Sequence, residues 1–209
     1  STRTWTLGIN QTMEKKIIPI ALFDMDGTLA DYVSAMKRDM ESMRGPREPE
    51  ADEKELWNNP EPHIKARKDT IEKRPGWWRD LEPMKTGMEV VKIAQELGFE
   101  IRVLTKGPND VPYAWAEKLE WCQEHLGKDT QVTITRDKST VYGRVLVDDY
   151  WPFMKGWLEN RKHGLGLMPG DSDNKDVPHP NVTYYDERNL DEVKKLLMRA
   201  RDRKDKEPF

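Results

Sequence analysis

Short apolar runs that lead into polar residues recur along the chain and predict buried β-strands. The first run, Ile17–Phe23, is rich in branched residues and leads directly into Asp24. Four later runs are also short and rich in β-branched or other apolar residues: Phe99–Thr105, Val132–Thr135, Arg144–Val147 and Gly164–Met168. The pattern therefore predicts five strands.

Helical spacing of apolar residues separates these strands. Between residues 90 and 97 apolar positions recur every three or four residues, and Gly98 follows where a helix C-cap glycine belongs. Tyr113–Leu126 and Leu190–Arg199 are the other helix candidates. Strands that alternate with helices of about 10–15 residues predict an α/β fold with a doubly wound, Rossmann-like parallel sheet.

Reactive side chains follow three of the predicted strands. Asp24, Thr105 and Asp148 each lie at the end of an apolar run. In open α/β sheets, ligands bind in the crevice outside the carboxyl ends of the strands. We therefore expect these three groups to converge on one site.

The segment 32–84 interrupts the alternation of strands and helices. It is highly charged and rich in proline, and we expect only two short helices in it, over Val33–Met43 and Ile64–Glu72. Such a segment is too small for an independent core. The predicted organisation has three parts: a catalytic core of residues 13–31 and 85–209, a helical cap of residues 32–84 inserted after the first strand, and residues 1–12, which are either a leader ahead of Met13 or a remnant of cloning.

Composition limits the class of protein further. The chain has 209 residues and a formal net charge of −3, and its basic and acidic residues are mixed along the whole length. No basic stripe indicates a dedicated nucleic-acid binder. Cys122 is the only cysteine, so no disulfide forms within the chain, which suits a cytoplasmic location. No apolar run approaches the roughly 18 residues that cross a membrane.

The sequence Asp24-Met-Asp26-Gly27-Thr28 carries the strongest chemical signal. Two carboxylates two residues apart at a strand end point the same way, and Gly27 allows a sharp turn. Such a pair either binds a hard cation or divides into a nucleophile and an acid, because like charges push the two pKa values apart. A turn with two solvated acids is the alternative, but the apolar strand in front of the motif favours a reactive site.

Four motifs, in order, resemble those of the haloacid-dehalogenase superfamily. They are Asp24–Thr28, the strand end at Thr105, a lysine at position 138, and the paired acids Asp148 and Asp149. Each motif is weak by itself, and their order and placement after predicted strands make the resemblance specific. It implies a Rossmann-like core with a cap, and a magnesium-dependent phosphatase.

Three segments are similar, more narrowly, to the 5′(3′)-deoxyribonucleotidases. They are Pro75–Pro83, Glu117–Gly127, and Thr135–Lys138 followed ten residues later by Asp148. The similarity covers roughly residues 22–150. It implies a deoxyribonucleoside monophosphate as substrate, Mg²⁺ as cofactor and a homodimer.

The acidic residues acquire expected roles from this chemistry and from the resemblance. Asp24 would attack phosphorus, and Asp26 would protonate the leaving oxygen and then activate water. The resemblance implies that Asp24, the backbone carbonyl of Asp26 and the carboxylate of Asp149 bind Mg²⁺. Asp148 would either ligate the metal or orient its neighbours.

Phosphate is expected to bind Thr105 through its hydroxyl group and Lys138 through its charge. Lys118 lies in register with a lysine of the family that approaches phosphate, and a solvated helix lysine is the rival interpretation. Lys106 departs from the family, which usually has serine there. Its backbone N–H could cradle phosphate, its side chain could add charge, or it could point to solvent.

The resemblance also places Tyr32, Trp77 and Trp78 against the nucleobase. Aromatic rings stack on any base with about 1–3 kcal/mol each. The alternative is that one of the two tryptophans belongs to the cap's own core. The four histidines show no metal-ligand spacing, and Cys122 is expected to be packed.

Two other functions stay open at this stage. One is a phosphatase of the same superfamily that acts on another small phosphomonoester or on a nucleic-acid end, although the missing basic track disfavours a polymer. The other is a catalytically silent nucleotide-binding protein, which the presence of all four motifs disfavours. The segment 151–181 has no functional interpretation.

Overall fold

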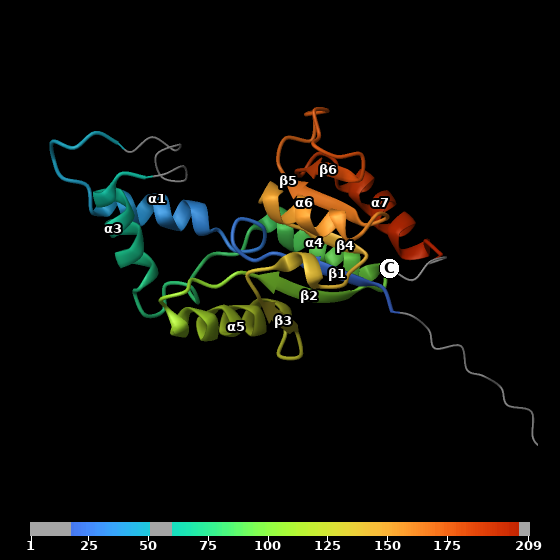
Figure 1. Ribbon diagram of the computed structural model, residues 1–209, viewed down its shortest axis with the longest axis horizontal. Helices are drawn as coiled ribbons and strands as arrows, with labels where there is room; N and C mark the ends of the chain where they lie inside the picture. Colours follow the sequence, from blue (N-terminus) through green and yellow to red (C-terminus); the bar gives the residue numbers. More distant parts are fainter. Residues whose placement is uncertain (1–17, 51–59, 205–209) are drawn as a thin grey trace, which may run out of the picture.

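The computed structural model describes residues 18–50 and 60–204. Within them, six strands form one parallel sheet in the order β3-β2-β1-β4-β5-β6 (Figure 1). The strands are β1 (Ile20–Phe23), β2 (Glu100–Thr105), β3 (Gln131–Ile134), β4 (Val145–Val147), β5 (Leu165–Pro169) and β6 (Val182–Tyr185). The order reverses at β1, which lies between β2 and β4. The predicted doubly wound α/β fold is therefore confirmed.

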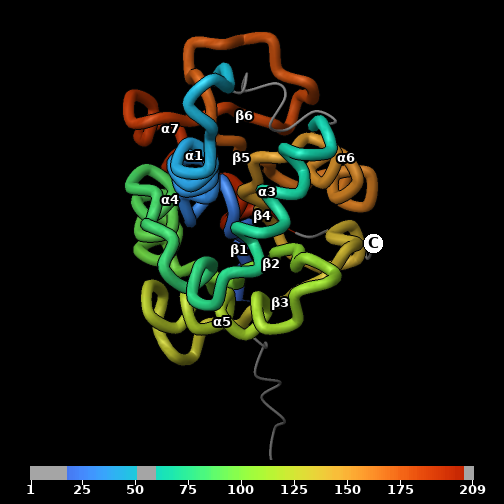
Figure 2. The backbone as a smooth tube through the Cα atoms, turned by 90° about the vertical axis from the view of Figure 1, so that its left-hand side faces the viewer, coloured from blue at the N-terminus to red at the C-terminus, as the bar shows by residue number. Residues whose placement is uncertain are grey.

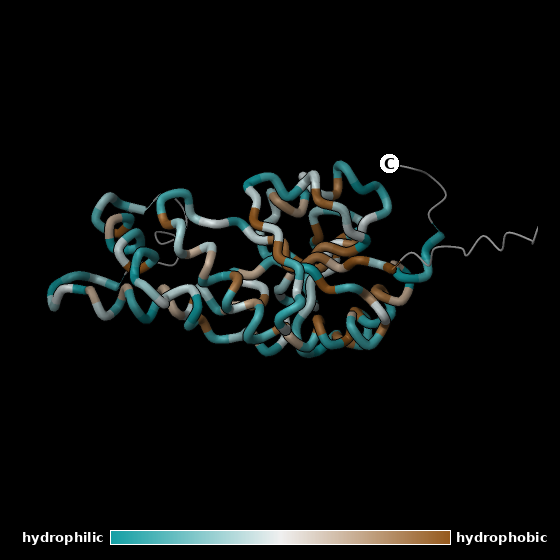
Figure 3. Tube along the Cα trace, turned by 90° about the horizontal axis from the view of Figure 1, so that it is seen from below, coloured by the Kyte–Doolittle hydropathy of each residue, from teal (hydrophilic) through white to brown (hydrophobic). Residues whose placement is uncertain are grey.

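Helices cover both faces of this sheet, because successive strand residues point to opposite sides. In β1, Phe23 joins one hydrophobic cluster and Leu22 the other. The first cluster packs against α4 (Lys85–Glu96), α5 (Pro112–Leu126) and α7 (Leu190–Asp202), and the second against α6 (Trp151–Glu159). Figure 2 shows α4 and α6 on opposite sides of the strands, and Figure 3 shows hydrophobic residues concentrated along them.

Two helices inserted after β1 lie beyond the carboxyl edge of the sheet (Figure 1). They are α1 (Tyr32–Ser42) and α3 (Pro62–Glu72), close to the predicted bounds. The chain enters and leaves this insert side by side, because Asp31 N–H donates to Glu82 O and Met84 N–H donates to Leu29 O. Both ends of the insert therefore meet the core at one place, next to the sheet edge that carries Asp24.

Among the described residues, one helix and one strand were not predicted from the sequence, nor was a short 3₁₀ turn at Lys138–Thr140. Helix α6 contains Pro152 and Gly156, which hide its helical signal, and β6 has only four residues. Residues 1–12, Met13 and Ile17 lie outside the described residues. Cys122 is buried as expected. In the part of the chain that is described, no helix is both long enough and apolar enough to span a bilayer.

Candidate active site at the carboxyl edge of the sheet

The ends of β1, β2 and β4 bring three of the predicted site residues together. Phe23, the last residue of β1, is paired with Val103 of β2 and with Val147 of β4. Asp24 follows Phe23, and its N–H donates to Val147 O at 2.8 Å. Thr105 ends β2 and Asp148 follows β4, so all three side chains lie at the same edge.

Lys138 links two of these carboxylates. It begins a short 3₁₀ turn, Lys138–Thr140, that precedes β4. Its Nζ lies 2.6 Å from Asp24 Oδ1 and 2.7 Å from Asp148 Oδ2, and only 2% of the residue is exposed. Burial lowers the pKa of Lys138, but the two carboxylates outweigh it and hold the pKa above its ordinary value. Lys138 is therefore a permanent positive charge at this edge.

Asp24, Asp148 and Asp149 form an acidic cluster in which one oxygen of each lies within 4.8 Å of the others. Gly27 has φ +77°, and a Cβ there would lie 2.1 Å from Asp149 Oδ2, so only glycine lets the motif turn against this carboxylate. Burial and then the charge of Asp24 raise the pKa of Asp148 to about 7. Asp149 is an exposed residue, but the protein around its carboxyl group and then the neighbouring carboxylates raise its pKa to about 8. Three hard oxygen donors with mutual repulsion fit Mg²⁺.

Asp26 meets Lys118 rather than the acidic cluster. Lys118 is completely buried, and its ammonium group donates to Asp26 Oδ2 and, at 3.2 Å, to Thr105 Oγ1. The alternative of a solvated Lys118 is therefore wrong. Among the described residues, Asp26 Oδ1 is buried without a hydrogen-bond partner. Burial, and then the charge of Asp24, raises the pKa of Asp26 despite Lys118.

Lys106 and Phe153 form the outer part of this edge. Lys106 is exposed, with Nζ 6.0 Å from the centroid of the Phe153 ring. The Nζ of Lys138 lies 4.6 Å from the same centroid. The Phe153 ring therefore lies near two positive charges, the buried one of Lys138 and the exposed one of Lys106.

Tyr32, Trp77 and Trp78 pack against one another where the cap meets the core. Their ring centroids are 5.0–5.6 Å apart, and the two tryptophans are 7% and 3% exposed. Trp77 Nε1 donates to Asp39 within the cap, whereas the ring of Trp78 lies 4.5 Å from Lys118 Nζ. Trp78 Nε1 also donates to the cap, to Glu72 O at 3.0 Å. Both tryptophans are therefore bonded to the cap, and Trp78 is the one that also contacts the charged centre.

A family model described as "5′ nucleotidase, deoxy (Pyrimidine), cytosolic type C protein" matches residues 18–202. The chain belongs to this family. As a member of the deoxy-5′-nucleotidase family with a hydrolase fold, the protein is a nucleotide phosphatase. The resemblance to the 5′(3′)-deoxyribonucleotidases, drawn from three segments of the sequence, is thereby confirmed.

Individual relatives of this nucleotidase agree with the family assignment. A Bordetella pertussis protein, provisionally named a 5′(3′)-deoxyribonucleotidase, is 30% identical over 166 residues, which are 76% of this chain and 89% of that protein. The human cytosolic-type 5′(3′)-deoxyribonucleotidase is 28% identical over 139 residues, 61% of this chain and 69% of that protein. A haloacid dehalogenase-like hydrolase from Xanthomonas campestris shares the fold, with a TM-score of 0.53 and 15% identity over 88% of this chain and 93% of that one.

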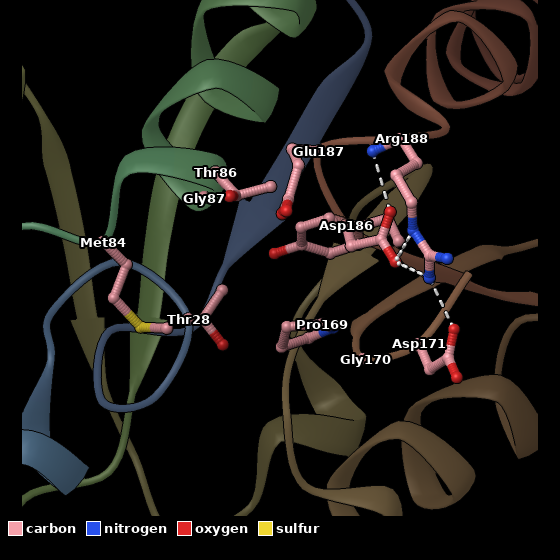
Figure 4. Close-up of a pocket in the computed structure, with 11 residues that line it drawn as sticks. Thr28, Met84, Thr86, Gly87, Pro169, Gly170, Asp171, Asp186, Glu187 and Arg188 are labelled. Carbon is pink, nitrogen blue, oxygen red and sulfur yellow. Dashed lines mark hydrogen bonds and ion pairs between the residues drawn. The ribbon is translucent and has the colours of Figure 1, made fainter. Parts of the chain in front are cut away.

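A pocket lies beside the nucleotidase centre, between the first turn of α4 and the ends of β5 and β6 (Figure 4). It has a volume of about 450 Å³, and its lining includes Thr28 of the motif but neither Lys118 nor Lys138. Arg188 at its rim is held at 2.6 Å by both Asp171 and Asp186. The positive charges suited to phosphate thus lie outside this pocket.

Sequence reasoning missed three residues near the nucleotidase centre. Phe153 lies on the unpredicted helix α6. The hydroxyl group of Tyr185 is buried without a hydrogen-bond partner among the described residues, and burial followed by the charge of Asp149 raises its pKa. Glu117 stands inside a family-like segment but had no assigned role. Only Glu117 had a sequence signal, its position next to Lys118.

Proposed function

We propose that this nucleotidase hydrolyses deoxyribonucleoside monophosphates in a magnesium-dependent reaction that passes through an aspartyl-phosphate on Asp24. The observation that carries the proposal is the convergence of Asp24, Lys138 and the acid pair Asp148–Asp149 on one sheet edge. Lys138 binds Oδ1 of Asp24, which leaves the other carboxylate oxygen for attack on phosphorus.

The reaction divides into two steps at Asp24. In the first, Asp24 forms a bond to phosphorus, the bond to the nucleoside oxygen breaks, and Asp26 gives that oxygen a proton. In the second, Asp26 takes a proton from a water molecule that attacks the aspartyl-phosphate, releasing phosphate and restoring Asp24. The raised pKa of Asp26 supports this role, because a general acid must be protonated before the first step.

Mg²⁺ would be held by Asp24, the backbone carbonyl of Asp26 and Asp149, and when bound it neutralises charge on the phosphoryl group. Asp148 is better suited to orientation than to direct ligation, because both of its oxygens are already engaged. Oδ2 accepts from Lys138, and Oδ1 accepts from Tyr150 N–H at 2.9 Å. Asp148 would thus fix Lys138 and the turn that presents Asp149.

The charges around Asp24 support phosphate binding next to this carboxylate. Lys118 and Lys138 are buried there, Thr105 offers a hydroxyl group, and Lys106 adds an exposed charge. The base would lie toward the cap, against Trp78 and the Tyr32 ring behind it. A cytoplasmic homodimer is part of the same proposal, since the resemblance implies one and the named human relative is a cytosolic type.

The test is phosphate release by the purified protein with and without Mg²⁺. We expect Asp24→Asn to lose about 10³-fold or more in kcat, whereas Asp173→Asn, an exposed carboxylate in the Arg188 cluster, should retain wild-type activity. Magnesium-dependent turnover that persists in Asp24→Asn would rule out the covalent mechanism.

The substrate class is tested with initial rates on dTMP, dUMP, dGMP, AMP, a 3′-phosphorylated oligonucleotide and a sugar phosphate. We expect the highest kcat/KM among the deoxyribonucleoside monophosphates. A preference for the sugar phosphate or for the oligonucleotide end would instead identify another phosphatase of the same fold.

A further inference from the structure

Helix α5 carries three side chains, four residues apart, that bind the segment returning from the cap to the core. We call Tyr113, Glu117 and Trp121 the α5 stripe, and residues 73–81 the return segment. Positions four apart lie on one face of a helix. The Tyr113 hydroxyl donates to Lys73 O, and Trp121 Nε1 donates to Leu81 O at 2.7 Å. The stripe therefore meets the return segment at both ends and, through Glu117, in the middle.

Glu117 makes the central contact with both carboxylate oxygens. Gly76 N–H donates to Oε1 at 2.6 Å, and Trp78 N–H donates to Oε2 at 3.2 Å. Gly76 has φ +86°, a turn conformation that suits glycine. Glu117 is 8% exposed, so it provides a charged acceptor for two N–H groups that would otherwise be buried without a partner.

The neighbouring residue on α5 joins this contact to the catalytic centre. Lys118 extends toward Asp26 and Thr105 while its Nζ lies 4.5 Å from the ring centroid of Trp78. Glu117 thus holds the backbone of Trp78, and Lys118 lies against its ring. Two consecutive residues of one helix therefore fix the position of Trp78 relative to the catalytic acid. Glu117 does so through hydrogen bonds, and Lys118 through a cation–π contact with the Trp78 ring.

We propose that Glu117, at the centre of the α5 stripe, is a positioning residue that determines how well the enzyme uses a phosphate ester carrying a base. It does so by holding the Gly76–Trp78 turn so that the Trp78 indole forms the cap-side wall next to Lys118. The dependence on a base rests on the proposed function, in which the substrate presents its base to the cap. Glu117 itself touches neither the substrate nor the reacting atoms.

The first test compares dTMP with 2-deoxyribose 5-phosphate, which lacks the base. In Glu117→Gln the amide oxygen can accept only one of the two N–H groups, and its own NH₂ opposes the other. We expect the ratio of kcat/KM for dTMP to kcat/KM for 2-deoxyribose 5-phosphate to fall about tenfold, mainly through KM for dTMP. Equal losses on both substrates would show a merely structural role and overturn the proposal.

Glu120 provides a matched control on the same helix. It is exposed, and its carboxylate lies 3.7 Å from Arg79 of the return segment. Glu120→Gln makes the same chemical change on the solvent side, where an ion pair contributes little, and we expect it to leave the ratio unchanged. Tyr113→Phe removes one end contact at an exposed position and should shift the ratio in the same direction as Glu117→Gln, by less.

Hydrogen exchange provides a readout that does not depend on the substrate. In Glu117→Gln we expect the Gly76 and Trp78 amides to exchange about tenfold faster, with α5 unchanged, and Glu120→Gln should show no such effect. Unchanged exchange in Glu117→Gln would overturn the contact, and faster exchange with an unchanged kinetic ratio would overturn its role in positioning. If the wild-type protein fails to hydrolyse dTMP, the proposed function fails, while the exchange comparison still decides whether Glu117 holds the turn.

Discussion

Two groups of carboxylates lie at the same edge of the sheet, and their surroundings shift the carboxyl pKa values in opposite directions. At β1 and β4, Asp24 and Asp148 share Lys138 while Asp149 lies beside them without an ion pair to it, and loss of water contact with mutual repulsion raises the pKa of Asp148 and of Asp149. At β5 and β6, the aspartates around Arg188 are tied to its guanidinium group, which together with backbone N–H groups lowers the pKa of Asp186. The first group thus contains a carboxylate, Asp149, that is not paired with the lysine, whereas every acid of the second group is paired with Arg188.

The comparison explains why acidic residues alone do not identify a metal site. Both groups follow strand ends, and both contain acids close together in the sequence, Asp148 and Asp149 in the first and Asp171 and Asp173 in the second. Each group has one basic side chain and three aspartates, and they differ in how these are bonded. All three acids of the second group pair directly with Arg188, whereas Lys138 pairs with Asp24 and Asp148 but not with Asp149, and Asp24 and Asp148 are buried. An acid cluster with raised pKa values at a buried strand end is therefore the better candidate for catalysis.

Removing the lysine of the first group should have the largest effect. Lys138→Met leaves Asp24 and Asp148 buried without their shared cation, and a phosphoryl group would lose a preorganised charge. We expect kcat on dTMP to fall about 10²–10³-fold. Arg188→Met removes the cation of the second group and should leave kcat within about twofold of wild type. Similar losses in both variants would remove the functional distinction between the two groups.

A smaller effect is expected on metal affinity. Asp149→Asn should raise the Kd for Mg²⁺, measured by titration calorimetry, about 10–100-fold. Asp171→Asn makes the same change at an acid already bound to Arg188 and should leave the Kd unaltered. Equal binding by both variants would place the metal elsewhere.

The pH dependence of metal binding sharpens the same contrast. Because the pKa of Asp149, the proposed metal ligand, is raised to about 8, this carboxyl group holds a proton below that pH and must release it when a cation binds. The affinity for Mg²⁺ should therefore rise as the pH increases from about 6 to 9. Calorimetry in buffers of different ionisation enthalpy would detect the released proton, and its absence at pH 7 would contradict the raised pKa.

The smallest effect concerns stability at the second group. Arg188→Gln removes exposed ion pairs, so we expect the Tm to fall by less than about 3 °C. Since the folded-state pKa of Asp186 is depressed, its contribution to stability is present above the unfolded-state pKa and is lost as the pH falls through the folded value. The difference in Tm between wild type and Arg188→Gln should therefore shrink in acid and in high salt.

The sequence allowed the fold and the core half of the candidate site to be predicted, because both depend on local order along the chain. Asp24, Thr105 and Asp148 follow apolar strands whose parallel pairing brings them to one edge. Lys138 was found from its spacing to the acids rather than from its own surroundings. The cap half could not be predicted in the same way.

Contacts between distant segments account for what was missed. The role of Glu117 depends on where residues 73–81 return to the core, which no spacing within α5 reveals. Phe153 reaches the two lysines only because Trp151–Glu159 folds as a helix despite its proline and glycine. The position of Trp77 against Asp39, rather than against the charged centre, likewise depends on packing within the cap.

The central place of β1 has a consequence for how the chain folds as it is synthesised. The strand partners of β1 are synthesised long after β1 itself, since Ile20 pairs with Glu100 and Ala21 pairs with Val145. Such distant pairing slows folding, because the loop must close before its contacts stabilise it. Strand β1, which precedes Asp24, is therefore synthesised early but is covered by its neighbouring strands only late. A nascent chain that ends before β4 would leave one edge of β1 unpaired and prone to aggregation.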